Sequence, residues 1–376
     1  MSATWRLLAD DGVDAADGLA LDEVLMGGYA LGAPRRPPTL RLYSYRDHCV
    51  LVGRYQNLEA EVDIGACART GTQVSRRLTG GGAIVMGTGQ LGIAYLDRAP
   101  SGERPKETIG ALSAGLVAGL AEIGIAASFH GKNDLEVAGR KIAGLGLYVD
   151  QAGAMLFHAS VLADLDVAFM LGVLHIPAAK LGGRASDAVR DRLTTVSAET
   201  GSLWDARRLR PVIARGFEAT LDVTLAQGTL EPGEQAGMKA LAASRYRSQD
   251  WLGERSVASD ASGSALLKTP AGLARIYLST HGNLVKSAIV VGDFNELPPS
   301  VVELESRLRW RRLEHDTIVA IVERCGAADA LGISAEQLAG AVMEAGQKSA
   351  PGPPADAVPV LTAGARPPVA RTGDTR

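Results

Sequence analysis

The most informative stretch of this 376-residue chain is Arg76-Arg77-Leu78-Thr79-Gly80-Gly81-Gly82-Ala83. Three successive glycines adopt positive φ at little cost, so their backbone N–H groups can wrap closely around an anion. The two arginines add fixed positive charge and planar guanidinium groups that suit carboxylate or phosphate. The flanking residues 72–74 and 83–86 are typical of strands, so we predict a strand–loop–strand turn and not the strand–loop–helix of a P-loop. A glycine-rich hairpin with surface arginines is the alternative that this stretch alone leaves open.

A second cluster lies further along the chain, at Asn133-Asp134 and at residues 139–146. Asn133 and Asp134 offer a side-chain amide and a carboxylate together. Lys141 stands among small residues and is followed by an apolar run. A lysine in such a setting is costly to bury unless an anion meets it. The cluster therefore indicates a second group of ligand-binding side chains.

These motifs together resemble the lipoate–protein ligase branch of the biotin/lipoate ligase and octanoyltransferase superfamily. The matching runs are the arginine–glycine stretch, residues 133–144 and Phe157-His158. Further segments that are similar to the family lie at 17–23, 40–45, 50–57 and 193–196, and more loosely at 247–253 and 281–284. The biotin ligases' run Gly-Arg-Gly-Arg-x-Gly-Arg is absent, which disfavours biotin as the substrate.

The resemblance implies an α+β fold, with a mixed β-sheet catalytic domain of the biotin/lipoate ligase type and a small α+β accessory domain. We expect the acyl-adenylate-forming catalytic domain at 1–226, a linker at 227–240, the accessory domain at 241–346 and a disordered tail at 347–376. Chain length favours two domains, and the Pro-, Ala- and Gly-rich tail has few large apolar residues. Sequence patterns predict helices at 19–31, 106–123, 206–225, 301–308, 317–324 and 335–344, and strands at 274–279 and 285–291.

The implied activity is ATP-dependent activation of lipoate, or octanoate, to acyl-AMP, followed by transfer to a lysine of a lipoyl carrier domain. The carrier would be a 2-oxoacid dehydrogenase E2, a glycine-cleavage H-type protein or a similar protein. ATP is needed because a carboxylate has no good leaving group, whereas the mixed anhydride expels AMP. The protein must stabilise the charge that develops as pyrophosphate departs, which is an electrostatic and positioning task. Leu145, Leu147 and Val149 are candidates for the acyl tunnel, although strand alternation directs some of them elsewhere.

The glycine turn is assigned to the anionic part of the ligands. We expect the N–H groups of Gly80, Gly81 and Gly82, together with Arg77, to bind the phosphate and the acyl carboxylate. Ala83 closes this binding motif.

The resemblance makes Lys141 the catalytic residue, which contacts both the acyl carbonyl and the phosphate. It places Asp134 near the nucleotide, where a carboxylate suits Mg²⁺, and Asn133 beside it as an orienting hydrogen-bonding group. His158 is placed beside the acyl pocket, with a satisfied core histidine as the equal alternative. Ser160 is assigned to the same pocket and not to a nucleophile, because no base network for it is evident.

One segment departs from the ligase pattern. Ligases of this family follow the glycine turn with an aromatic residue and His-Asp-x-Gly-Asn, but Met86 and Gly87 replace the His-Asp pair here. Residues 87–91 read Gly-Thr-Gly-Gln-Leu, which is closer to the Gly-Pro-Gly-Gln-Leu of octanoyltransferases. The main alternative is therefore octanoyl or lipoyl transfer between carrier proteins without ATP, through a cysteine thioester.

The cysteines argue against that alternative, because none of Cys49, Cys67 and Cys325 follows Lys141 within the catalytic domain. A third possibility, a non-catalytic module that binds acyl-adenylate, is disfavoured by the retained lysine and the complete glycine turn.

Composition and residue spacing limit the other kinds of partner, cofactor and location that the protein could have. A formal net charge of −3 gives no reason to expect nucleic acid as a partner. The N-terminus shows no signal peptide, and the nearly uncharged stretch 109–129 is too weakly apolar to favour a bilayer. The histidines show no metal-ligand spacing, and an odd number of cysteines without Cys-x-x-Cys favours a reducing compartment. We therefore expect a cytoplasmic protein that binds neither nucleic acid nor membrane, and the resemblance adds ATP and Mg²⁺ as the implied cofactors.

Overall fold

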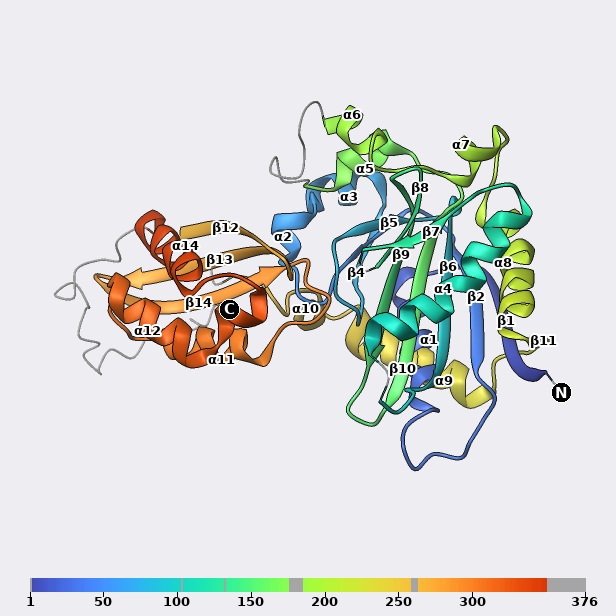
Figure 1. Cartoon of the computed structure of the whole chain (residues 1–376), viewed down its shortest axis with the longest axis horizontal. Helices are drawn as coiled ribbons and strands as arrows, with labels where there is room; N and C mark the ends of the chain where they lie inside the picture. The colour runs from blue at the N-terminus through green and yellow to red at the C-terminus, as the bar shows by residue number, and fades with distance from the viewer. Residues whose placement is uncertain (1, 103, 132, 176–184, 258–262, 350–376) are drawn as a thin grey trace, which may run out of the picture.

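The computed structural model describes residues 2–102, 104–131, 133–175, 185–257 and 263–349. It has a large α+β domain built on two sheets and a smaller α+β domain built on a third sheet (Figure 1). The mixed-sheet α+β architecture expected from the sequence is confirmed.

The main sheet has eight strands in the order β11-β1-β2-β6-β10-β9-β8-β7. β1 runs parallel to both β11 and β2, and every other pairing in this sheet is antiparallel. The strands are β1 (Ala3–Val13), β2 (Thr39–Tyr45), β6 (Gln90–Arg98), β7 (Ser128–His130), β8 (Asp134–Val137), β9 (Arg140–Val149), β10 (Ala154–Leu162) and β11 (Val223–Gln227). β8, β9 and β10 are consecutive neighbours, so the sheet brings the second sequence cluster together.

Helices cover both faces of this sheet. On one face, α4 (Pro105–Glu122) and α8 (Ala206–Leu221) share an apolar core with Leu40 and Leu42 of β2. On the other face, α1 (Ala15–Gly27) packs against alternate residues of the same strand. One of these, Arg41, is fully buried and pairs with Asp22 of α1 at 2.6 Å. Because successive side chains of β2 point to opposite faces of the sheet, one face of this strand is apolar and the other carries a buried ion pair.

α4 and α8 approach closely because glycines line their contact. A Cβ built on Gly216 would lie 2.2 Å from the carbonyl oxygen of Gly115 and 2.3 Å from the amide nitrogen of Gly119. The nearly uncharged stretch 109–129 therefore contains a buried packing helix. No helix in the described parts of the chain is long and apolar enough to cross a membrane.

We expect Gly216→Val to lower the stability of the protein by about 1–3 kcal/mol, because the new side chain would force the two helices apart. Gly110→Ala is the matched control: a Cβ at Gly110 on α4 would meet nothing closer than 4.0 Å, and alanine favours the helix. Thermal melts should show a lower midpoint for the first variant and an unchanged or higher one for the second. Equal midpoints for both would contradict the packing role of Gly216.

The glycine turn belongs to a second, three-stranded sheet in the order β4-β3-β5. It comprises β3 (Cys49–Val52), β4 (Gln73–Arg76) and β5 (Ile84–Met86), with β3 parallel to β4 and antiparallel to β5. The strand–loop–strand prediction is confirmed, but the alternative of a simple hairpin is wrong, because β3 lies between the two strands that the turn connects. Short helices pack around this sheet: α2 (Leu58–Glu61), α3 (Ile64–Thr70), α5 (Val167–Val173) and α6 (Ala185–Arg190), whereas α7 (Val196–Thr200) joins the core of the main sheet.

The smaller domain is an antiparallel three-stranded sheet with helices packed on it. Its elements are β12 (Gly263–Thr269), β13 (Gly272–His281), β14 (Leu284–Gly292), α11 (Pro299–Leu308), α12 (His315–Cys325), α13 (Ala327–Leu331) and α14 (Ala335–Lys348). The strands and helices expected in this region are present, whereas β12 and α13 were not expected. We call this unit, residues 263–349, the accessory domain. The tail that was expected to be disordered begins at residue 347. Residues 347 and 348 belong to α14, and the tail from residue 350 onward lies outside the described residues.

The segment 227–240, expected to be a linker, is structured instead. It contains the end of β11 and most of α9 (Pro232–Leu241), which packs against α1, where a Cβ on Gly237 would lie 3.2 Å from Val24. The next elements, a π-helical turn η2 (Ala242–Tyr246) and α10 (Gln249–Leu252), also join the core around α1. Residues 241–252, expected in the accessory domain, therefore pack on the large domain. The predicted helix 206–225 correspondingly ends at Leu221, before β11.

Candidate functional site

The glycine turn is held by close backbone approaches. Gly81 has φ of +89°, in the left-handed region that favours glycine. A Cβ on the neighbouring Gly53 would lie 1.9 Å from the carbonyl oxygen of Gly81. The glycine turn therefore packs directly against the segment that follows β3. The two backbones can approach this closely because Gly53 and Gly81 have no side chains at the contact.

Arg77 supports the turn from beneath. Its guanidinium donates to the carbonyl oxygens of Gly80 at 2.6 Å, Gly82 at 2.8 Å and Leu51 at 2.8 Å. Burial lowers the pKa of Arg77 to about 10, so the group still carries its charge at neutral pH. The structure differs here from the expected contact with phosphate or carboxylate, because the donors of this buried arginine face the backbone of the turn. Arg77 shapes the glycine turn and does not line the pocket.

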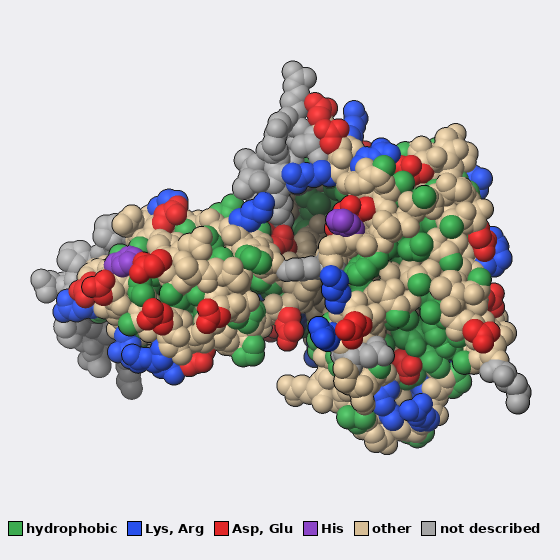
Figure 2. Space-filling view, in the orientation of Figure 1, with side chains coloured by type: hydrophobic (Ala, Val, Ile, Leu, Met, Phe, Trp, Pro, Cys, Tyr) green, Lys and Arg blue, Asp and Glu red, His purple; other side chains and the backbone are tan. Residues whose placement is uncertain are grey.

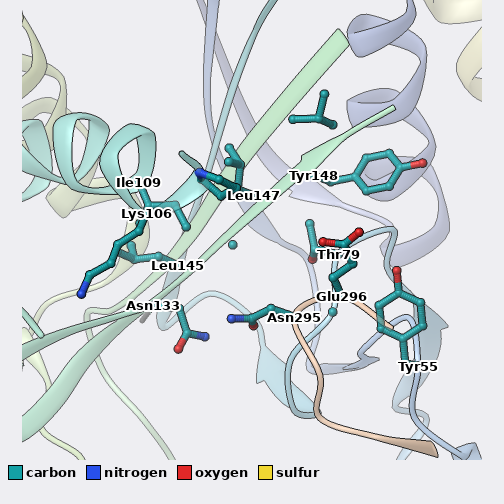
Figure 3. Close-up of a pocket in the computed structure, with 14 residues that line it drawn as sticks. Tyr55, Thr79, Lys106, Ile109, Asn133, Leu145, Leu147, Tyr148, Asn295 and Glu296 are labelled. Atoms are coloured by element: carbon teal, nitrogen blue, oxygen red, sulfur yellow. The ribbon is translucent and has the colours of Figure 1, made fainter. Parts of the chain in front are cut away.

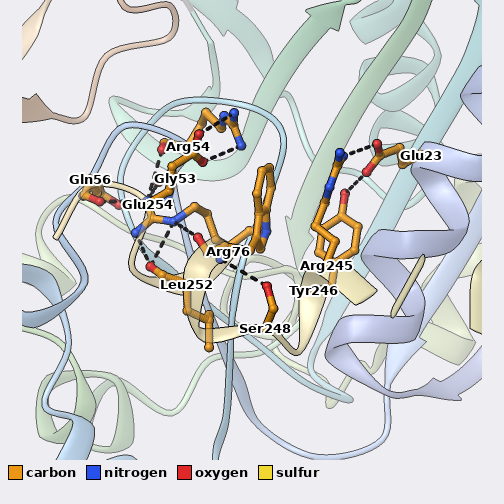
Figure 4. A network of polar contacts seen from close by, with 11 residues as sticks. Glu23, Gly53, Arg54, Gln56, Arg76, Arg245, Tyr246, Ser248, Leu252 and Glu254 are labelled. Atoms are coloured by element: carbon orange, nitrogen blue, oxygen red, sulfur yellow. Dashed lines mark hydrogen bonds and ion pairs between the residues drawn. The ribbon is translucent and has the colours of Figure 1, made fainter. Parts of the chain in front are cut away.

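Arg76 points in a different direction and anchors the chain that leads to the accessory domain. Its fully buried guanidinium donates to carbonyl oxygens on both sides, including Gln56 at 2.7 Å and Leu252 at 2.6 Å. Trp251 completes the contact by donating its indole N–H to the carbonyl oxygen of Arg76 at 2.8 Å, and Arg54 stacks over its ring (Figure 4). This network fixes α10 against the strand that precedes the glycine turn.

The accessory domain covers part of the turn. The N–H of Gly81 donates to the carbonyl oxygen of Phe294 at 2.7 Å, and the N–H of Gly292 donates to that of Tyr55 at 2.9 Å. A Cβ on Gly80 would lie 2.0 Å from the oxygen of Phe294. One of the N–H groups expected to bind an anion is thus engaged by the accessory domain in this structure.

Lys141 and Asp134, both from the second sequence cluster, form an ion pair. Lys141 Nζ lies 2.7 Å from Asp134 Oδ1, and each side chain is about one-third exposed (33% and 32%). The pair flanks Gly144, which is in register with Asp134 on β8 and with Ser160 on β10. A Cβ on Gly144 would lie 3.0 Å from Lys141 Nζ and 3.6 Å from Ser160 Oγ. The small residue at this position therefore lets the lysine, the carboxylate and the serine hydroxyl share one exposed region.

The backbone of Lys141 is clamped by the segment 192–195. Lys141 N–H donates to the carbonyl oxygen of Arg192 at 2.8 Å, and Thr194 N–H donates to that of Lys141 at 2.9 Å. Glu199 of α7 then accepts from Thr194 Oγ1 and, at 2.7 Å, from Arg140 Nη2. The sequence singled out this segment only by resemblance, and its direct contact with Lys141 is a finding of the structure.

A pocket of about 410 Å³ lies between the catalytic domain and the accessory domain (Figure 3). Its walls are largely apolar, with Ile109 of α4 and Leu145 and Leu147 of β9. One end is polar, and the Asn295 side chain points toward Asn133 there (Figure 3). Such a mixture of apolar walls and a few polar groups is typical of a small-molecule site.

The pocket gathers only part of the predicted site. Gly80, Asn133, Leu145, Leu147 and Val149 line it, whereas Arg77, Lys141, His158 and Ser160 are not among its lining residues. Sequence reasoning missed several residues that do line it, which come from separate segments: Tyr55, Lys106, Tyr148, Asn295 and Glu296. No sequence signal marks them, because they meet only when the accessory domain packs on β9 and α4.

His158 lies beneath the pocket wall and holds the turn through Thr79. Arg77 Nε donates to Thr79 Oγ1 at 3.2 Å, and the Thr79 hydroxyl shares a hydrogen bond of 2.9 Å with His158 Nε2. Burial, and secondly the charge of Arg77, lowers the pKa of His158 to about 3. The ring is therefore neutral at neutral pH. The satisfied core histidine, one of the two alternatives from the sequence, agrees with this hydrogen bond to Thr79, and Thr79 itself lines the pocket.

We expect His158 to make the folded state sensitive to acid. Its folded pKa lies below the ordinary value of 6.5, so the unfolded chain takes up a proton first and stability falls as pH drops from about 6.5 toward 3. His158→Gln removes this contribution, whereas His175→Gln, at an exposed position, leaves it. Urea unfolding at pH 7 and pH 5 should show a smaller loss of stability for the first variant than for wild type. An equal loss in both would contradict a neutral His158.

These features define an α+β domain whose site combines a glycine turn, a lysine–aspartate pair and an apolar pocket. The chain belongs to the lipoyl protein ligase A/B catalytic domain family, whose model matches residues 14–218. It is therefore an enzyme of the lipoate ligase and octanoyltransferase type.

Among its relatives, an octanoyltransferase LipM from Symbiobacterium thermophilum is 29% identical over 67% of this chain and 98% of the relative. The lipoate-protein ligase A subunit 1 of Thermoplasma acidophilum is 27% identical over 62% of this chain and 90% of the relative. Among solved structures, the bipartite lipoate protein ligase of Thermoplasma acidophilum, studied with its E2 lipoyl domain, matches with a TM-score of 0.60 and 25% identity over 69% of this chain and 99% of that chain. LipL1 of P. falciparum in complex with lipoate has a TM-score of 0.66 at 15% identity, over 85% of this chain and 94% of that chain, which shows the shared fold.

Proposed function

We propose that this protein activates lipoate, or octanoate, with ATP to form acyl-AMP and then transfers the acyl group to a lysine of a lipoyl carrier domain. The observation that carries the proposal is the Lys141–Asp134 pair, reachable from solvent and adjacent to Asn133 in the pocket wall. The charges of such a pair suit a reaction that brings a carboxylate and phosphates together.

Two bond exchanges make up the proposed reaction. A carboxylate oxygen of the acid attacks the α-phosphorus of ATP, and the bond to pyrophosphate breaks. In the second exchange, the neutral amine of the carrier lysine attacks the acyl carbonyl, AMP leaves with the bonding electrons, and the amine loses a proton. Lys141 would stabilise the negative charge that develops in each exchange, and the apolar walls at Ile109, Leu145 and Leu147 would hold the acyl chain.

Asp134 suits a magnesium ion that arrives with ATP. Among the described residues, no group of three or more His, Cys, Asp or Glu side chains could hold a metal ion by itself. Magnesium that is bound with a nucleotide needs only one or two protein carboxylates in addition to phosphate oxygens. Asp134 offers one such carboxylate, next in sequence to the pocket-lining Asn133, and the ion would supply further positive charge for the departing pyrophosphate.

The second candidate is acyl transfer between carrier proteins without ATP. The relatives named octanoyltransferase LipM favour it, as does the run Gly87-Thr88-Gly89-Gln90-Leu91. As considered from the sequence, this route proceeds through a cysteine thioester and so needs a reactive thiolate near the acyl site.

The three cysteines supply no such thiolate. Cys49, Cys67 and Cys325 are buried in three different apolar clusters, and the last belongs to the accessory domain. Burial raises the pKa of each thiol above its ordinary value, which favours the unreactive protonated form. Their environment favours the ATP-dependent route, and unpaired buried thiols fit a reducing compartment such as the cytoplasm.

Direct assay separates the two candidates. The protein is incubated with an apo lipoyl domain and either lipoate with ATP and Mg²⁺, or an octanoyl carrier protein without ATP, and the lipoyl domain is weighed intact. We expect the lipoyl mass to be added only in the first mixture. Octanoylation in the second mixture, without modification in the first, would replace the ligase proposal by the transferase.

We also expect the variant Cys49→Ser, Cys67→Ser, Cys325→Ser to retain ligation with free lipoate and ATP, because adenylation needs no thiol. Serine at these buried positions lowers stability, so a thermal melt must show that the variant is folded at the assay temperature. A folded variant that has lost ligation would support the thioester route.

A further inference from the structure

The accessory domain carries a basic surface at the junction of α11 and α12. We define the basic patch as Arg307, Arg309, Trp310, Arg311, Arg312 and Arg324. Figure 2 shows Lys and Arg side chains gathered along the lower edge of the accessory domain, in the region that α11 and α12 occupy in Figure 1. Part of the patch is concave, because Arg307, Arg311 and Arg324 line a depression of about 450 Å³ together with Asp316 and Thr317.

Most of the charge in the basic patch is not neutralised. Arg307 pairs with Glu303 at 2.6 Å, and Arg312 lies 3.4 Å from Glu314. Arg309, Arg311 and Arg324 form no ion pair with any residue that the structure describes. Since the whole chain has a formal net charge of −3, these three arginines concentrate positive charge on an otherwise slightly acidic protein.

Trp310 gives the basic patch an aromatic anchor. Its side chain is 58% exposed, and its φ of +59° is uncommon for a bulky residue. The backbone keeps this conformation through hydrogen bonds to the start of β14: Trp310 N–H donates to Val285 O at 2.6 Å, and Val285 N–H donates to Arg311 O at 2.9 Å. Tryptophan and arginine are among the residues that contribute most of the binding energy in protein interfaces, and here an exposed tryptophan lies among arginines.

The basic patch is rigidly linked to the pocket. α11 begins just after Asn295 and Glu296, which line the pocket, and ends at the first residues of the patch. A ten-residue helix is about 15 Å long, and a domain of about 100 residues spans roughly 30 Å. One small protein domain can therefore rest on the patch while it presents a side chain to the pocket.

From this arrangement we propose that the basic patch docks the carrier protein that accepts the acyl group, through an acidic face of that carrier. The inference rests on the proposed function for the identity of the occupant. Unpaired arginines would steer an acidic carrier and speed its encounter, and Trp310 would supply the buried contact.

The test compares two steps of the reaction in Arg311→Glu/Arg324→Glu and in Trp310→Ala. We expect the Michaelis constant for an apo E2 lipoyl domain of net negative charge to rise at least tenfold, with lipoate-dependent pyrophosphate release in the absence of carrier unchanged. The salt dependence of kcat/KM for the carrier should also weaken in the double variant. The control with the same charge change is Arg208→Glu/Arg215→Glu on the exposed side of α8, which should change neither quantity. Because Arg215 pairs with Glu122 at 2.9 Å, a thermal melt must first show that this control is folded.

Several outcomes would overturn the proposal. If both folded variants keep the wild-type Michaelis constant for the carrier, the basic patch does not dock the carrier. The same conclusion follows if the Michaelis constant rises equally in the α8 control. Tight binding of a DNA duplex that the double variant loses, with carrier kinetics unchanged, would assign the patch to nucleic acid. If the wild-type protein releases no pyrophosphate, the proposed ligase function fails. The role of the basic patch is then tested separately, by titrating the lipoyl domain into the wild-type protein and into the double variant. Equal affinities of the two proteins for the lipoyl domain would reject the docking proposal.

Discussion

Lys141→Ala should abolish acyl-adenylate formation while leaving the fold intact. Lys141 and its charged partner Asp134 are each about one-third exposed, so the Asp134 carboxylate remains in contact with solvent when the lysine is removed. Loss of a charge-assisted contact to the developing negative charge should cost on the order of 3 kcal/mol or more, which is at least about a hundredfold in rate. The measurement is lipoate-dependent pyrophosphate release, followed by intact-mass analysis of a lipoyl domain.

The control for this prediction is Lys239→Ala, at an exposed position in the last turn of α9. It should release pyrophosphate at the wild-type rate. A Lys141→Ala protein that melts like wild type and still labels the lipoyl domain at a near-normal rate would make Lys141 a structural residue and would remove the main support for the ligase proposal.

Arg77→Met should impair both folding and activity, because the guanidinium binds the glycine turn from within. Methionine fills similar volume but leaves the carbonyl oxygens of Leu51, Gly80 and Gly82 without these donors. Unsatisfied buried acceptors cost about 1–3 kcal/mol each, so we expect a loss of roughly 3 kcal/mol or more in the free energy of unfolding. For a domain of this size that corresponds to a melting midpoint lower by roughly 6–12 °C.

Activity should fall further than stability explains, because Thr79 loses its donor and the turn loses its shape. Arg69→Met, at an exposed arginine of α3, is the matched control and should melt and react like wild type. The distinguishing readout is pyrophosphate release at a temperature where both variants are fully folded. Normal release by folded Arg77→Met would show that the turn holds its conformation without the arginine.

Several local features of the fold follow from sequence pattern alone. The turn between β4 and β5, the packing helix α4 and the β13–β14 hairpin were all predicted, because glycine conformations and apolar periodicity act over a few residues. The cluster of Asn133, Asp134 and Lys141 was also predicted, since β8 and β9 are adjacent in sequence and pair directly. Resemblance to the ligase family contributed the roles of these residues, which spacing does not provide.

Other features depended on contacts between segments far apart in the chain. The sequence assigned Arg77 to the ligand, because a surface arginine and a buried one look alike until the path of β3 is known. It assigned 227–240 to a linker, because the glycines and proline there do not reveal that α1 offers a face for α9 to cover.

The sequence by itself therefore determined that the chain has a glycine turn, a lysine–aspartate cluster and no cysteine between Lys141 and the accessory domain. Only the tertiary structure decided that the arginine holds the turn, that the segment 192–195 clamps Lys141, and that Tyr55, Asn295 and Glu296 close the pocket. The physical reason is that the first set rests on the chemistry and conformational freedom of neighbouring residues. The second set rests on which surfaces pack together, and that is fixed by burial over the whole molecule.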